Sequence, residues 1–110
     1  MAIDNSLYDS LESTYKKIQD YLNSSTLGRE HSAMIVKHEE LAELLEKLDI
    51  EAIEEQSKDI NSLHNELDKI KEISEQVAED LISEFDSTTT VTKVVNGLDK
   101  IFSKTADVIV

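Results

Sequence analysis

The scarcity of turn-forming residues constrains this chain more than any other feature of its sequence. Its 110 residues include no proline and only two glycines, Gly28 and Gly97. An all-β fold reverses direction many times, and proline and glycine make most tight reversals possible. The sequence therefore predicts an all-α protein. A chain of this length has room for a single domain, 1–110, with one modest core.

Two amphipathic helices are predicted in the first half of the chain. The helix expected over 5–23 has a stripe at intervals of three and four residues: Leu7, Leu11, Tyr15, Ile18 and Leu22. The helix expected over 30–48 has the same pattern: Met34, His38, Leu41, Leu45 and Leu48. Between them, the polar segment 23–28 ends in glycine and predicts a reversal of chain direction.

One long helix is predicted over 50–85. Its apolar seam consists of Ile53, Ile60, Leu63, Leu67, Ile70, Val77, Leu81 and Phe85. Asp49 is a suitable N-cap for this helix, so a break at Asp49 is preferred. The alternative is a single bent helix over 30–85, with a stutter in its heptad pattern at Ala52 and Gln56.

The length of the helix predicted over 50–85 has a consequence for assembly. At 1.5 Å per residue it would be about 54 Å long, well beyond the length of its neighbours. Within a monomer, its seam could be buried end to end only if two shorter helices packed in tandem along it or if it kinked. Otherwise part of the seam would face water unless a second copy or a partner helix covered it. We therefore expect a homodimer or a helix-in-groove complex with another protein.

The last segment, 88–109, is compatible with two structures. Its β-branched residues precede Asn96 and Gly97, a dipeptide that favours a hairpin. A stripe at helical spacing nevertheless continues across Gly97: Val91, Val94, Leu98, Ile101, Thr105 and Val108. A helix with a kink or fraying near Gly97 is preferred, and a hairpin or a detachable tail is the alternative.

Together these segments predict an antiparallel helical bundle of three to four helices. One long central helix and coiled-coil-like packing are expected in it.

Negative charge is concentrated in one part of the chain. The 24 acidic and 11 basic residues give a formal net charge of −13. Segment 50–86 contains twelve acids and three bases, whereas 87–110 contains two acids and three bases. Direct nucleic-acid binding is disfavoured, because phosphate neutralisation requires clustered lysine and arginine. Glu72, Glu75 and Glu79 form a candidate acidic surface for a basic partner.

The residues that usually carry out catalysis or bind metals do not form a motif here. The chain has no cysteine, and its glycines are too few for a phosphate-binding loop. His31 and His38 are seven residues apart, two helical turns, and His64 belongs to a different predicted helix. We therefore expect no enzymatic activity, no cofactor and no metal site.

The chain carries no recognisable targeting segment. Its first five residues lack the basic and apolar regions of a secretory signal peptide. No apolar run approaches the roughly 20 residues that span a bilayer. A cytoplasmic protein without a membrane span is expected, although export without a leader is compatible with the sequence.

A non-enzymatic protein–protein interaction module is the function predicted by these features, as an adaptor, an assembly factor or an export-type chaperone. It would act through the helical seam and the apolar C-terminal helix, whose candidate partner-binding residues are Leu63, Leu67, Ile70, Val77, Leu81, Phe85, Val95, Leu98 and Phe102. One alternative is an acidic decoy or inhibitor that occupies a basic protein or nucleic-acid-binding site. A metal- or ligand-binding bundle is a further alternative.

Overall fold

The computed structural model describes residues 6–24, 27–83 and 86–109, and these residues form helices joined by short connections. The helices are α1 (Ser6–Ser24), a short 3-10 helix η1 (Arg29–His31), α2 (Ser32–Lys47), α3 (Ile50–Gln56), α4 (Ile60–Ile82) and α5 (Ser87–Ile109). The described residues contain no strand, so the predicted all-α class is confirmed. The described residues form five α-helices, rather than the three to four expected.

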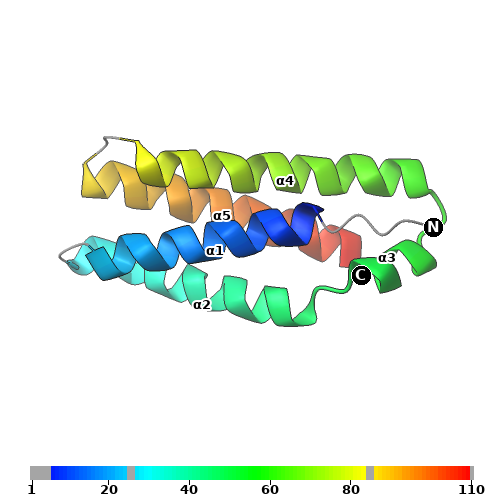
Figure 1. Cartoon of the computed structure of the whole chain (residues 1–110), viewed down its shortest axis with the longest axis horizontal. Coiled ribbons are helices and arrows are strands. Elements are labelled where there is room, and N and C mark those ends of the chain that lie inside the picture. The colour runs from blue at the N-terminus through cyan, green and yellow to red at the C-terminus, as the bar shows by residue number, and fades with distance from the viewer. Residues whose placement is uncertain (1–5, 25–26, 84–85, 110) are drawn as a thin grey trace.

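The four long helices surround one core. Figure 1 shows α1 and α4 running in one direction, and α2 and α5 in the opposite direction. α4 packs most extensively against α5 and α1, and α2 packs against α1 and α5. α2 and α4 therefore occupy opposite corners of the bundle, and the chain passes diagonally between them through α3. Neighbouring helices are not all antiparallel, because α1 lies beside α4 and points the same way.

The prediction of a single long helix over 50–85 is wrong. The break at Asp49 is present, but a second break at 57–59 separates α3 from α4, which has 23 residues. α5 also has 23 residues, so it can cover α4 along its length. The uncovered seam that predicted a homodimer therefore does not form.

Aspartate caps explain where three helices begin. The Asp49 carboxylate accepts a hydrogen bond from the Ala52 amide at 3.0 Å, and the Asp59 carboxylate accepts one from the Ser62 amide at 3.1 Å. At the start of α5, the Asp86 carboxylate accepts a hydrogen bond from the Thr89 backbone amide at 2.7 Å. These bonds satisfy amides that have no partner inside the helix, and they hold the pKa of Asp59 and of Asp86 below the ordinary value.

The core contains apolar residues from all four long helices. Its most deeply buried members come from the predicted stripes: Leu11, Ile18, Met34, Leu41, Ile70, Val94, Leu98 and Ile101. Burial of these side chains is the main favourable contribution to folding. The amphipathic spacing of the sequence therefore serves the interior of a single chain.

Gly97 lies inside a continuous α5, so the preference for a helix is correct, the fraying expected near Gly97 does not occur, and the hairpin alternative is wrong. A Cβ atom built on Gly97 would overlap Cγ2 of Val77 on α4. Val77 is buried and β-branched, so its side chain has little freedom to move aside. Glycine is therefore required by the close approach of α4 and α5 rather than by a turn.

Gly97→Ala is expected to destabilise the protein, although alanine favours a helix over glycine by about 1 kcal/mol. Overpacking against Val77 typically costs about 1–3 kcal/mol and outweighs that gain. Urea unfolding measures the effect, with Asn96→Ala as the control, because Asn96 is exposed on the same turn of α5 and its replacement should be neutral or slightly stabilising. The combined variant with Val77→Ala should lose less stability than the two single losses added together. An alanine variant more stable than the native protein would contradict the close contact.

Candidate protein interface

The predicted partner-binding residues mostly build the interior. Six of them are buried within the single chain: Leu63, Leu67, Ile70, Val77, Leu81 and Leu98. Val95 and Phe102 are half-buried and pack against the same core, and Phe85 lies outside the described residues. The seam is therefore covered by the chain's own helices, and a free interaction surface has to be sought among other residues.

Four large apolar side chains are exposed in the described part of the chain: Leu27, Ile35, Val36 and Ile82. Ile82, at the C-terminal end of α4, has 75% of its surface exposed. Leu81, beside it in the sequence, belongs to the core. Two consecutive apolar residues at the end of a helix thus point in different directions, and only the first contributes to the interior.

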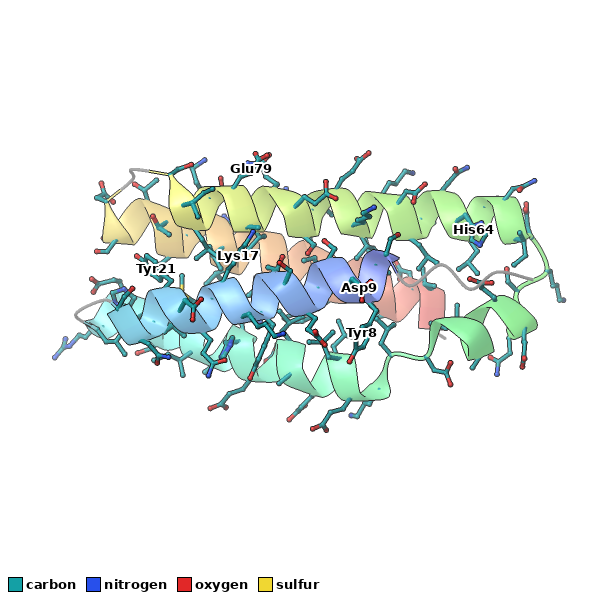
Figure 2. The ribbon with its side chains drawn as sticks, in the orientation of Figure 1. Tyr8, Asp9, Lys17, Tyr21, His64 and Glu79 are labelled. Carbon is teal, nitrogen blue, oxygen red and sulfur yellow. The ribbon has the colours of Figure 1, made fainter. Side chains whose placement is uncertain are left out.

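A groove between α1 and α4 lies at Ile82. It has a volume of about 340 Å³ and is lined by Leu81 and Ile82 of α4 and by Lys17, Asp20, Tyr21 and Ser24 of α1. Figure 2 shows Lys17 and Tyr21 in the space between the two helices. Because α1 and α4 run in the same direction, their C-terminal ends lie together at one end of the bundle, and the groove lies there. Its apolar wall can accept one side chain of a partner.

Acidic residues continue from this groove along α4. Asp68, Glu72, Glu75 and Glu79, here called the acidic row, are spaced by three and four residues, and all four are exposed. None of them forms an ion pair with another described residue. Ile82 follows Glu79 by three residues, so it shares the face of the row. Glu79 projects from the outer edge of α4 (Figure 2).

Small polar residues set the contact between α1 and α4. The buried Thr14 hydroxyl donates to the Ser74 carbonyl at 3.0 Å and lies 2.8 Å from the Ser74 hydroxyl, which accepts from Ser10 at 3.1 Å. These bonds satisfy polar groups inside the bundle and fix how α1 lies along α4. They therefore position Tyr21 relative to Ile82. Ser10, Thr14 and Ser74 were not predicted from the sequence as contact residues, and the signal that could have indicated them is the serine that interrupts the apolar seam after Ile70.

The three histidines occupy separate environments. The buried His31 accepts a hydrogen bond from the Gly28 amide through Nδ1 at 3.0 Å. His38 stacks on Tyr15 with ring centroids 4.1 Å apart and donates from Nε2 to the Tyr15 carbonyl at 3.2 Å. His64 Nε2 lies 3.7 Å from the Glu54 carboxylate. No group of three or more potential metal ligands occurs among the described residues.

A second groove, of about 290 Å³, lies between α4 and α5 beside Gly97. Lys93 and Lys100 line this groove. The largely buried Asp80 also lines it and accepts a hydrogen bond from the side-chain amide of Gln76. Both signs of charge line this groove, and Lys17 and Asp20 likewise line the groove at Ile82. The two grooves differ because the one at Ile82 lies beside the acidic row, which gives that surface an excess of negative charge.

Comparisons with protein-family models, with curated proteins and with solved structures found no match. None of the described helices combines the length and the apolar character needed to cross a membrane. The function of the chain therefore has to be inferred from its surface.

His38 should make stability depend on pH. Burial holds its pKa below the ordinary value of 6.5, although the bond to the Tyr15 carbonyl opposes the shift. The unfolded state therefore binds more protons between the lowered pKa and 6.5, and the unfolding free energy falls as pH drops through this window. His38→Gln keeps an amide donor for Tyr15 and should lose less stability between pH 7.5 and 5.5, measured by urea unfolding. His31 and His64 are present in both proteins, so an equal loss would contradict this role of His38.

Proposed function

We propose that this protein is a non-enzymatic interaction module that binds a basic amphipathic segment of a partner protein on its α1–α4 face. The observation that carries the proposal is the position of Ile82. This residue is 75% exposed and lies beside an apolar groove, at the end of an acidic row that has no ion pairs within the described residues.

Each part of this surface has its own physical role. An apolar partner side chain in the groove would remove both itself and Ile82 from water, and full burial of one such side chain is worth about 1.5–3 kcal/mol. Lysine or arginine residues at helical spacing would lie opposite the acidic row. Such charges mainly accelerate association and reject acidic partners, and their effect is screened by salt. The groove would thus provide the anchor, and the row would select the charge of the partner.

The proposal keeps the predicted class of function and changes the surface. An adaptor, an assembly factor or a chaperone would each need such a surface, and the partner decides among them. The acidic decoy remains a second candidate, because the unpaired row alone could occupy a basic site. The two candidates differ in whether the groove contributes to binding.

Binding can be tested with a fluorescent 14-residue peptide, two repeats of Leu-Lys-Lys-Leu-Leu-Lys-Leu, which forms a basic amphipathic helix. A peptide of the same composition with a scrambled order is the control. We expect tenfold or tighter binding of the amphipathic peptide, with NMR amide shifts at Tyr21, Glu79 and Ile82. Ile82→Ser should abolish the shifts at the groove, and Leu27→Ser, another exposed apolar residue, should not.

Charge reversal separates the two candidate functions. Replacing Glu72, Glu75 and Glu79 by lysine should weaken binding at this face and leave the melting temperature almost unchanged, because the three side chains are exposed. If the scrambled peptide binds equally well and Ile82→Ser has no effect, charge alone is responsible. That outcome would replace the groove-binding module with the decoy.

A further inference from the structure

We infer that the outer face of α2 is a second docking surface for a basic amphipathic segment, which makes the protein bivalent. This face consists of Ile35, Val36, Glu39, Glu43 and Glu46. The inference rests on the proposed function for the class of partner, but on different residues and a different helix. A protein with both surfaces would bridge two basic segments.

The first observation concerns the apolar residues of α2. Met34 and Leu41 are fully buried and attach the helix to the core. Ile35 and Val36 are 37% and 51% exposed and lie on the other side of α2. Side chains of this size, exposed next to each other on a helix, leave apolar surface in water that a bound partner would cover.

The second observation concerns charge. Glu39, Glu43 and Glu46 are exposed and form no ion pair with described residues. Lys37 does not neutralise them, because its ammonium lies 2.8 Å from Asp99 of α5 and 3.6 Å from Glu40. Its ammonium is also 5.8 Å from the centre of the Phe102 ring of α5. Lys47, four residues after Glu43, is exposed on the same side of α2, so this face combines apolar side chains with an excess of negative over positive charge. On the α4 face, Lys71 likewise lies beside Asp68, Glu72 and Glu75, and the acidic residues again outnumber it.

The arrangement of the helices separates the two surfaces. α2 and α4 occupy opposite corners of the bundle, since each packs against α1 and α5 (Figure 1). Their outward faces therefore point away from each other, and one helical segment cannot cover both. Two segments can bind at the same time without contact.

Charge also decides which occupant fits the α2 face. A second copy of the chain would bring another net charge of −13 to a face that is already acidic. A basic segment gains from the same charges. We therefore assign the face to a basic partner rather than to self-association.

The stoichiometry of peptide binding tests this inference. The probe is the amphipathic leucine–lysine peptide, titrated into the full chain by calorimetry, with sedimentation velocity to exclude aggregation. We expect two peptides per chain and NMR shifts at both Val36 and Ile82. The double variant Ile35→Ser with Val36→Ser should bind one peptide and keep the shifts at Ile82. Ile82→Ser should bind one peptide and keep the shifts at Val36, and the triple variant should lose at least tenfold in affinity at both surfaces.

Other outcomes would overturn the inference in distinguishable ways. Binding of one peptide per chain, with NMR shifts only at Ile82, would exclude the α2 face as a docking surface and leave the proposed function intact. NMR shifts only at Val36 would instead exclude the groove at Ile82 as a docking surface, and a protein with one docking surface could not bridge two segments. The chain could also be a dimer in the absence of peptide. If the double variant Ile35→Ser with Val36→Ser is then a monomer, the α2 face binds a second copy rather than a basic partner. Equal binding of the scrambled peptide at both surfaces would show attraction by charge without apolar docking.

Discussion

α4 is held between α1 and α5 by two contacts made of small side chains, and the rest of the structure depends on its position. On one side, Gly97 leaves room for Val77 to approach the backbone of α5. On the other side, Thr14 and Ser10 of α1 hydrogen-bond to Ser74 of α4 between the two helices. Close packing on both sides buries the apolar seam of α4, and the outward side of the helix is left to carry charge. The interior and the candidate interface are therefore two faces of the same helix.

The fold could be predicted from the sequence wherever local signals decided it. Helical periodicity and the lack of turn residues indicated an all-α chain, and Asp49 marked a helix start. Asp59 and Asp86 are caps of the same kind, but the apolar seam continues past Asp59 from Ile53 to Ile60, and this continuity hid the break there. The direction of each helix and the diagonal path through α3 could not be predicted, because they depend on packing between distant segments.

The candidate interface was harder to predict than the fold, for a physical reason. A periodic apolar stripe indicates which residues will be covered, but it does not indicate whether the cover is the same chain or another one. Leu67 and Leu98 were assigned to a partner and are covered by their own chain. Ile82 and Val36 lie off the stripes, and such residues stand out only when the helices around them are known. Glu72, Glu75 and Glu79 are exposed, as expected of charged side chains without a buried partner, whereas their role toward a basic partner stays a prediction.

The negative charge gives these exposed apolar residues a consistent explanation. Exposed side chains such as Ile82 and Val36 gain by burial against any apolar surface, including that of a second copy of the chain. Glutamates around each residue oppose that outcome, because two like-charged faces repel each other when they approach. The same glutamates would favour a segment of opposite charge, so in the proposed function one set of residues discourages self-association and promotes binding of a basic partner. On that proposal the high acidity of the chain is a condition for keeping the apolar side chains exposed, and these side chains are where a partner would gain most by binding.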